Sequence, residues 1–480
     1  MKRLQMFING EWTESSSRGI ISSINPATLE TIAVVPRGDS KDVDRAVHAA
    51  RNAFESSEWR DILPVERGRM LLKMATIIRE QKEELSYFES LDTGKPLTQA
   101  QADVETAARY FEYYAGVADK ILGETIPVRS DVLDYTLREP LGVTAHIIPW
   151  NYPISITSRS LAPALATGNT AVLKPAEDTP ITAIRLAAIS ELAGFPKGVI
   201  NVVTGYGYEA GAALAEHPDI DHITFTGSVE TGSVIMKAAS VHIKPLTLEL
   251  GGKSPNIVYA DANLEDAAQW VVKSITQNAG QTCSAGSRLI VEKRIHQSFV
   301  QRVVELMSEL RLGPGLESPD VGPIISEKQI NRIKNYMEIA EQEGSPILIG
   351  GRRSKDITSG FFFEPTVIDT VLPTSRLAQE EIFGPVLVVF PFETNEEALQ
   401  LANNTQYGLV TGIWTTNLNK AHWLAKRVRS GQVFVNNYGS TSGVEMPFGG
   451  SGKSGFGREK GLEAIKHYTQ PKNIAIKIEI

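Results

Sequence analysis

The stretch from Gly142 to Glu249 alternates short apolar runs with runs of helical length, and this alternation limits the fold more than any other feature of the chain. Runs such as VTAHIIPW, NTAVLKPAE and DHITFTG predict strands, while ISITSRSLAPALATG, ITAIRLAAISELAG and YEAGAALAEH (208–217) predict helices. Repeated strand–helix units are typical of a parallel sheet with helices on both faces. Because ligands of such sheets bind at the carboxyl ends of the strands, the loops that follow these strands are candidate binding loops.

The same alternation resumes after Glu249 and predicts a second α/β domain. Its strands are expected at 254–260, 288–292, 346–351, 361–370, 380–392, 409–415 and 431–438, and its helices at 264–278, 294–310, 326–343, 395–404 and 419–428. Residues 1–36 predict short strands, followed by three amphipathic helices at 42–54 (with Ser40 as the cap), 64–91 and 97–118. Two β-prone segments, 121–141 and 465–480, have no core of their own.

Composition narrows the class of protein. A chain of 480 residues with 42% hydrophobic and 22% charged residues is expected to form a globular protein of two or three domains. The net charge of -8 argues against a nucleic-acid partner. The start MKRLQMFINGEW lacks the apolar run of a secretory signal, and no run predicts a membrane helix. A single cysteine excludes an intrachain disulfide, which fits a cytoplasmic protein.

Cys283 and Glu249 are the first candidates for chemistry. Small polar residues flank Cys283 on both sides, which suits a sulfur that a ligand approaches, although a lone cysteine is more often a buried apolar residue. Glu249 ends a run in which Leu246, Leu248 and Leu250 alternate with polar residues, although a glutamate before two glycines is often a solvated turn residue. A thiol nucleophile needs a base and a donor for the oxyanion that it creates.

That donor has a candidate in Asn151, inside the sequence Pro149-Trp150-Asn151-Tyr152-Pro153 that follows the first strand of the series. The two prolines restrict the turn, so an amide there would be held in place. The alternative is an asparagine that only stabilises the turn.

Two glycine patterns compete for a nucleotide. The pattern at 205–210 fits the dinucleotide fingerprint, but the acidic residue that should end the next strand is absent, because Asp219 and Asp221 precede that strand. The pattern at 227–232 lies between a strand and a helix and suits a phosphate or an ordinary helix cap. At the end of another strand, Lys174 and Glu177 suit ribose hydroxyls or a surface ion pair.

Seven motifs together resemble the aldehyde dehydrogenase superfamily. They are, in chain order, WNYP, KPAE, FTGS, LELGGKSP, GQTCSAGSR, EEIFGPV and PFGGSGKSGFGRE. The resemblance covers nearly the whole chain and is specific because seven motifs occur in one order. Within this superfamily, the chain resembles the NAD(P)-dependent, hydrolytic, non-acylating enzymes.

The resemblance implies two Rossmann-like α/β domains with parallel sheets and a small β arm for oligomerisation. The NAD-binding domain would comprise 1–120 and 142–249, the catalytic domain 250–448, and the arm 121–141 with 465–480. The implied assembly is a homodimer or homotetramer.

The resemblance also implies the reaction. Cys283 would attack an aldehyde, Asn151 and the backbone N–H of Cys283 would bind the oxyanion, hydride would pass to NAD, and Glu249 would activate water to release the carboxylic acid. No metal is expected. The residues expected around the cofactor are Ile147, Pro149, Trp150, Asn151, Lys174, Ala176, Glu177, Gly207, Phe225, Thr226, Gly227, Ser228, Thr231, Leu250, Gly251, Gln329, Glu381 and Phe383. NAD is expected rather than NADP, because Glu177 would repel a 2′-phosphate.

One departure bears on the substrate. Many members carry Trp-Lys where this chain has Arg159-Ser160. An arginine here resembles succinate-semialdehyde and some aromatic-aldehyde dehydrogenases, and it would pair with a substrate carboxylate. The alternative is a structural arginine bound to neighbouring carbonyls. The residues expected in the substrate pocket are Tyr152, Ile156, Arg159, Thr282, Ser284 and Tyr438.

Three rival functions remain. Glu249, Lys253 and Cys283 superficially match the catalytic set of a nitrilase-type amidohydrolase, which has no use for a nucleotide-binding region. A CoA-acylating aldehyde dehydrogenase would not need the base at Glu249. A catalytically silent member of the fold would bind NAD at most and show no turnover.

Overall fold

The alternating stretch forms the centre of an eight-stranded sheet in the computed structural model, which describes residues 2–439 and 443–478. The strand order is β20-β12-β11-β8-β9-β10-β2-β3. Strands β8 to β12 are mutually parallel, as predicted, and the other three are antiparallel to their neighbours. The strands are β2 (Met6–Ile8), β3 (Glu11–Thr13), β8 (Val143–Ile147), β9 (Thr170–Lys174), β10 (Ile200–Val202), β11 (His222–Thr226), β12 (Leu246–Glu249) and β20 (Gly455–Phe456).

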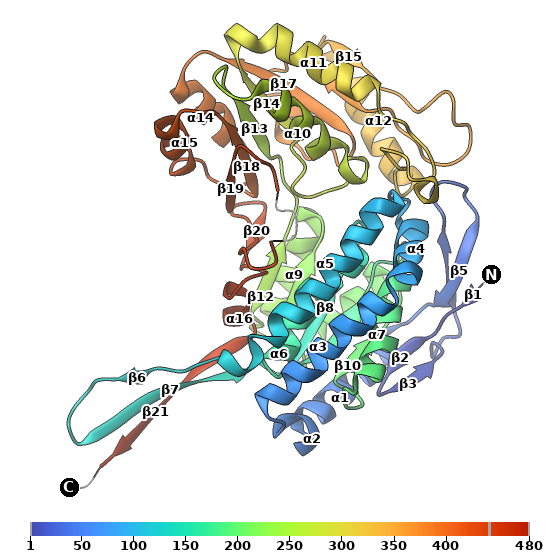
Figure 1. The fold of residues 1–480 in the computed structure, drawn as a ribbon. Coiled ribbons are helices and arrows are strands. Elements are labelled where there is room, and N and C mark those ends of the chain that lie inside the picture. The colour runs from blue at the N-terminus through green and yellow to red at the C-terminus, as the bar shows by residue number, and fades with distance from the viewer. Residues whose placement is uncertain (1, 440–442, 479–480) are drawn as a thin grey trace.

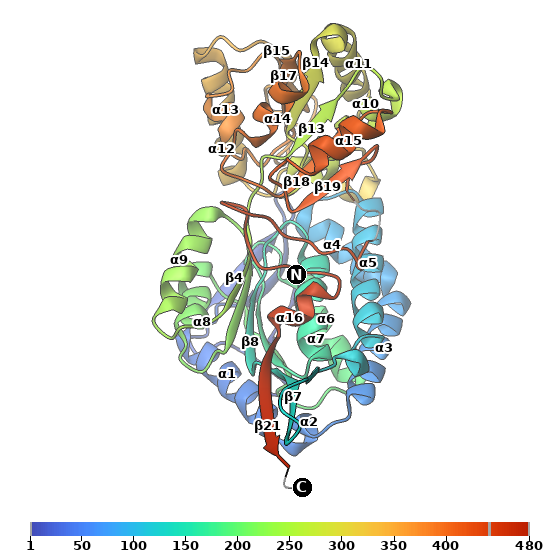
Figure 2. The ribbon, with the colours of Figure 1, turned by 90° about the vertical axis from the view of Figure 1, so that its left-hand side faces the viewer.

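Helices cover both faces of this sheet because the parallel strands are connected by crossovers (Figures 1 and 2). One face packs against α3 (Pro64–Glu80), α4 (Lys82–Thr93), α5 (Leu97–Ala115), α6 (Pro153–Ala166) and α7 (Ile181–Ala193). The other face packs against α1 (Ser40–Glu55), α8 (Ala212–Glu216) and α9 (Val229–Ser240). Two short helices, α2 (Ser57–Arg60) and α16 (Glu463–His467), complete this body.

Strand order locates a crevice in the first sheet. Its parallel part begins at β8, adds β9 and β10 on one side, and then adds β11 and β12 on the other. The loops after β8 and β11 therefore leave the sheet in opposite directions, which opens a crevice at the carboxyl ends of these two strands.

A seven-stranded sheet forms the second body, in the order β15-β16-β17-β14-β13-β18-β19, with only β15 antiparallel. Its strands are β13 (Pro255–Val258), β14 (Arg288–Glu292), β15 (Ile347–Ile349), β16 (Thr366–Ile368), β17 (Val386–Phe392), β18 (Val410–Trp414) and β19 (Gln432–Val435). One face packs against α10 (Leu264–Thr276) and α11 (His296–Ser308). The other packs against α12 (Glu327–Gln342), α13 (Arg376–Gln379), α14 (Asn395–Asn403) and α15 (Leu418–Ala425).

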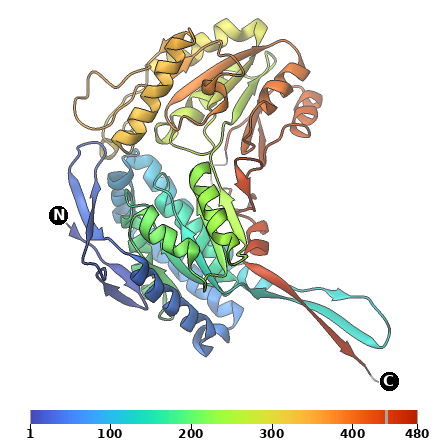
Figure 3. The same ribbon diagram turned by 180° about the vertical axis from the view of Figure 1, so that it is seen from behind.

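The two segments without a core of their own pair with each other. Strand β21 (Thr469–Lys477) is antiparallel to β7 (Val132–Pro140) along its whole length, and β6 (Thr125–Ile126) lies on the far side of β7. Together they form an arm that projects from the first body (Figures 1 and 3). A separate small sheet joins β1 (Lys2–Arg3), β5 (Thr31–Pro36) and β4 (Ile20–Ile24).

The predicted domain boundaries stay a prediction. The predicted arm includes 479–480 and the predicted catalytic domain includes 440–442, and these five residues lie outside the described part of the chain.

Three local predictions were wrong. The helix expected at 64–91 divides at Gln81 into α3 and α4. The cap of α1 is Asp39 rather than Ser40, because the Asp39 carboxylate accepts from the backbone N–H groups of Lys41 and Asp42. The helix expected at 208–217 begins with a π-helical turn at 207–211.

Among the residues that the structure describes, no helix combines the length and the apolar character required to cross a membrane.

Gly455 brings β20 against the strand that carries Glu249. A Cβ atom at Gly455, where φ is +100°, would lie 1.9 Å from the carbonyl oxygen of Leu248. We expect Gly455→Ala to push β12 and β20 apart and to lower the thermal unfolding midpoint by several degrees, since backbone strain of this kind costs about 1–3 kcal/mol. Calorimetry compares it with Gly116→Ala, whose Cβ would lie no closer than 3.4 Å to any atom outside its neighbours. Equal midpoints for the two variants would contradict the prediction.

Candidate active site

Cys283 lies on a loop between α10 and β14 that turns sharply before the thiol. Asn278, Ala279 and Gly280 have positive φ angles of 49°, 52° and 73°. A Cβ atom at Gly280 would lie 2.1 Å from the carbonyl oxygen of Gly384, and one at Gly252 would lie 2.4 Å from that of Cys283. Glycine at these two positions therefore lets the loop pack against the backbone on either side.

Gln281 holds this loop from within. Its side-chain amide donates to the carbonyls of Asn278 (3.1 Å) and Pro323 (3.3 Å), and its side-chain oxygen accepts from the N–H of Ile325 (2.9 Å). Gln281 belongs to the GQTC motif, but nothing in the sequence indicated this structural role.

Asn151 joins the first sheet to the Cys283 loop. It follows β8, is buried, and donates from Nδ2 to the carbonyl of Gln281 at 3.0 Å. Asn278 donates to the carbonyl of Asn151 at 3.0 Å. Because a side-chain amide has two hydrogens, the bond to Gln281 orients Asn151 and leaves one hydrogen for an oxyanion.

Glu249 ends β12 and is 1% exposed. Neither carboxylate oxygen accepts a hydrogen bond from a residue that the structure describes. A Cβ atom at Gly449 would lie 2.7 Å from Oε1, so glycine there makes room for the carboxyl group. Burial raises the pKa of Glu249 well above its usual value; the nearby Glu459 adds to the increase, and Arg159 opposes it.

Arg159 is committed to Glu459. The two side chains form a buried ion pair, Arg159 also donates to the hydroxyl of Thr226 at 3.3 Å, and its guanidinium lies 5.0 Å from the ring centre of Phe448. This geometry favours the structural alternative for Arg159, with a carboxylate rather than carbonyls as its partner. Glu459 also accepts from the hydroxyl of Thr224 at 3.0 Å. The sequence analysis did not single out Glu459.

The charges around the thiol disfavour its ionised form. Burial raises the pKa of Cys283 to about 12; the carboxylates of Glu249 and Glu381 add to the increase, and Arg159 opposes it. Cys283 and Glu249 therefore influence each other's ionisation across the end of the crevice.

The predicted substrate-pocket residues lie around the loop. The hydroxyls of Tyr152 and Thr282 are 2.9 Å apart, and the hydroxyl of Tyr438 donates to the carbonyl of Ser284 at 2.8 Å. Ile156 is buried on α6, the helix that follows Asn151.

Most of the predicted cofactor residues lie at the ends of neighbouring strands of the first sheet. Nζ of Lys174, at the end of β9, is 3.0 Å from Glu177, and Ser228 caps α9 by accepting from the N–H of Thr231. Ile147, Ala176, Phe225, Thr226, Leu250 and Gly251 are buried; Pro149, Trp150, Gly227, Gln329 and Phe383 are half-buried; and Gly207 is exposed. The half-buried and exposed residues of this set are therefore the ones whose surface a ligand can contact.

Glu381 reaches this crevice from the second body. It accepts from the N–H of Gly252 at 2.9 Å, and burial raises its pKa to about 7. The rings of Trp150 and Phe383 meet edge to face with centres 5.3 Å apart. Both bodies therefore supply crevice walls.

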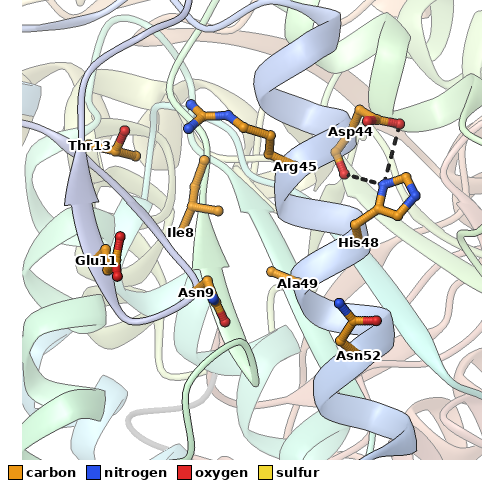
Figure 4. Close-up of a pocket in the computed structure, with 9 residues that line it drawn as sticks. All are labelled: Ile8, Asn9, Glu11, Thr13, Asp44, Arg45, His48, Ala49 and Asn52. Atoms are coloured by element: carbon orange, nitrogen blue, oxygen red, sulfur yellow. Dashed lines mark hydrogen bonds and ion pairs between the residues drawn. The ribbon is translucent and has the colours of Figure 1, made fainter.

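A cluster of Asp44, His48 and His217 lies elsewhere, beside a surface pocket that Asn9 and Glu11 also line (Figure 4). Its ligand-type atoms lie within 4.8 Å of one another. However, Nδ1 of His217 accepts from a backbone N–H at 3.2 Å, so its Nε2 carries the proton and donates to Asp44. The cluster is thus satisfied by its own hydrogen bonds.

Comparisons with known proteins agree on one family. The model of the aldehyde dehydrogenase family matches residues 12–474. The chain is 44% identical over 474 residues to betaine aldehyde dehydrogenase of Bacillus subtilis (strain 168), covering 98% of this chain and 96% of that protein. It is 44% identical over 475 residues to hydroxyisobutyraldehyde dehydrogenase of Mycolicibacterium austroafricanum, covering 99% and 94%. The NAD+ complex of aldehyde dehydrogenase from Bacillus cereus is 43% identical, with a TM-score of 0.98 and coverage of 100% and 97%.

The raised pKa of the thiol predicts slow alkylation in the free protein. Only the thiolate reacts, so the rate with iodoacetamide should rise about tenfold per pH unit, with no plateau up to about pH 10. Because the chain has one cysteine, all label incorporation reports on Cys283. A plateau below about pH 8 would mean that the thiol already ionises near neutrality and would contradict the electrostatic description.

Proposed function

Because the chain belongs to the aldehyde dehydrogenase family, we propose that it oxidises an aldehyde to the carboxylic acid with NAD and water, using Cys283, Glu249 and Asn151. One observation carries the assignment of residues. The single thiol lies close enough to a buried carboxylate, one that accepts no hydrogen bond from a described residue, for that carboxylate to raise the pKa of the thiol.

Cys283 performs the first step. Its thiolate sulfur forms a bond to the aldehyde carbon, and the carbonyl π electrons move to the oxygen, which becomes an oxyanion. The free amide hydrogen of Asn151 and the backbone N–H of Cys283 bind that oxygen. The bond from Asn151 to the carbonyl of Gln281 orients the amide before the substrate arrives.

Residues at the ends of β9, β11 and β12 are suited to hold NAD. Lys174 with Glu177 would bind the adenosine ribose, the start of α9 at Ser228 the pyrophosphate, and Glu381 the nicotinamide ribose. The crevice at the point where the strand order reverses fits a dinucleotide. Bound NAD supplies the acceptor for the hydride that leaves the thiohemiacetal carbon. NAD is preferred to NADP because the Glu177 carboxylate would repel a 2′-phosphate.

Glu249 completes the reaction as the general base. It takes a proton from water, the water oxygen adds to the thioester carbon, and the sulfur leaves with its electron pair to regenerate Cys283. Only the ionised carboxylate can do this. Since the pKa of Glu249 is raised, the turnover rate should increase with pH along a limb that lies well above pH 4.5.

We also propose that the protein is a cytoplasmic homodimer or homotetramer. The arm exposes apolar side chains, among them Leu133 (43%), Leu137 (42%) and Ile476 (46%), on strands that pair only with one another. A second copy of the chain would remove these side chains from water.

The substrate we propose is an uncharged aldehyde, aliphatic or aromatic, rather than an acidic semialdehyde. The charge of Arg159 is already paired with Glu459, so a substrate carboxylate would have to compete for it in a buried site. The named substrates of the relatives, betaine aldehyde and hydroxyisobutyraldehyde, differ in charge and belong to those proteins alone.

Replacement of Glu249 by glutamine should stop the reaction at the thioester. Glu249→Gln should release one NADH per site in a burst and then stall, because acylation needs no base at that position whereas hydrolysis does. Stopped-flow NADH absorbance measures this, with Cys283→Ala as the control that binds NAD but gives neither burst nor turnover. Steady turnover by Glu249→Gln, or restored turnover of the wild type only when CoA is added, would contradict water activation by Glu249.

Substitution of Arg159 should affect every aldehyde alike. Arg159→Gln leaves Glu459 buried without its cation, so kcat should fall about tenfold or more for hexanal, benzaldehyde and succinate semialdehyde together. Steady-state NADH formation with the three aldehydes measures this. A selective loss of activity toward succinate semialdehyde would instead make Arg159 its carboxylate-binding residue.

A further inference from the structure

We propose that Lys95, at the corner between α4 and α5, is a positioning residue for Cys283 that acts through the ring of Tyr152 and the hydroxyl of Thr282. The inference rests on the proposed role of Cys283 as the nucleophile. Lys95 belongs to none of the motifs that carried the functional assignment.

Lys95 is a cation that the fold buries completely. Its side chain is 0% exposed, and Nζ lies 2.5 Å from Oδ2 of Asp103 and 3.6 Å from Oε1 of Glu89. Burial raises the pKa of Glu89 to about 7 and also raises that of Asp103. Removing these charges from water is costly, so we expect the ammonium group of Lys95 to make a further stabilising contact.

That contact is the ring of Tyr152. Nζ of Lys95 lies 4.1 Å from the ring centre. The attraction between a cation and an aromatic face is strongest where water is excluded. The hydroxyl of Tyr152 is 2.9 Å from that of Thr282, the residue before Cys283. Burial raises the pKa of Tyr152, so the phenol stays protonated. Two contacts therefore link Lys95 to the nucleophile loop.

The same corner also holds the oxyanion side of the site. Glu89 accepts from the N–H of Ile154, in the first turn of α6, at 3.4 Å. Gln99, in the first turn of α5, accepts from the N–H of Asn278, whose side chain binds the carbonyl of Asn151. Residues 89–99 thus contact both the start of α6, the helix that follows Asn151, and the loop of Cys283.

Glycines fix the corner against the second body. A Cβ atom at Gly94, where φ is +80°, would lie 2.5 Å from Pro323, and one at Gly315 would lie 2.2 Å from the carbonyl of Lys95. The carbonyl of Pro323 in turn accepts from Gln281. Because the corner is packed this closely, a displacement of Lys95 would also displace the residues around it.

The two roles open to Lys95 predict different results. A residue that only stabilises the fold would change the thermal midpoint and leave the folded enzyme as active as before. A positioning residue changes kcat and the reactivity of Cys283 while leaving NAD binding intact, because a small displacement of a nucleophile costs up to about a hundredfold in rate.

The experiment is a double-mutant cycle in the full-length protein. Lys95→Met and Tyr152→Phe should each lower kcat about tenfold, with the Kd for NAD within about twofold of the wild type. The kcat of the double variant should be about the same as that of either single variant, because both changes break the same chain of contacts. Arg67→Met is the matched control. It removes a half-buried cation that binds the far end of α6 through the carbonyl of Ala166, and it should lower stability without lowering kcat.

A second variant covers the case in which Lys95→Met does not fold. Lys95→Met/Asp103→Leu removes both members of the closer ion pair, so only Glu89, 3.6 Å from Nζ, loses a cation, and the variant should show the same loss of kcat. Unchanged kcat in either folded Lys95 variant, or a double variant about a hundredfold impaired through additive effects, would overturn the proposal.

Alkylation of Cys283 separates this inference from the proposed function. The rate with iodoacetamide at fixed pH should differ between wild type and the Lys95 variants whether or not an aldehyde is oxidised. A wild type that forms no NADH from any aldehyde defeats the proposed function alone. Identical alkylation rates in variants and wild type defeat the role of Lys95 alone.

Discussion

The burial of Glu249 is the constraint on which the rest of the site depends. A carboxylate removed from water is costly to ionise, and no described residue donates a hydrogen bond to this one. The acidic Glu459 opposes its ionisation, and the cationic Arg159 favours it but is paired with Glu459. The result is a carboxyl group with a raised pKa beside a thiol with a raised pKa, so each group reacts only once a ligand or a change of pH favours its ionised form.

Two sheets supply the parts of this arrangement separately. The first sheet carries Asn151 after β8 and Glu249 at the end of β12, and the second body carries Cys283 just before β14. Backbone contacts at Gly252 and hydrogen bonds through Gln281 and Asn151 join the two bodies at the thiol. The crevice proposed for the cofactor opens at the reversal of strand order, beside the same loops. One junction would therefore serve both nucleotide and aldehyde.

The sequence predicts the parallel sheets well and singles out the main site candidates, because both depend on local patterns. Strand–helix alternation is a local signal, and the motifs around Cys283, Glu249 and Asn151 keep chemistry-bearing residues next to turns. The sequence does not predict partners that are distant in the chain. Arg159 had two interpretations that only the position of Glu459 could separate, and Lys95 contacts Tyr152 only because α5 packs on α6. The break at Gln81 was missed because α3 and α4 share one continuous helical period.

The central claim is that an acyl group is carried on Cys283 until water activated by Glu249 removes it. Mass spectrometry of Glu249→Gln, quenched with acid after mixing with NAD and hexanal, tests this most directly. The account predicts a protein heavier by one hexanoyl group, with the added mass on the peptide that contains Cys283. Formation of NADH and hexanoic acid with Cys283 unmodified would contradict it.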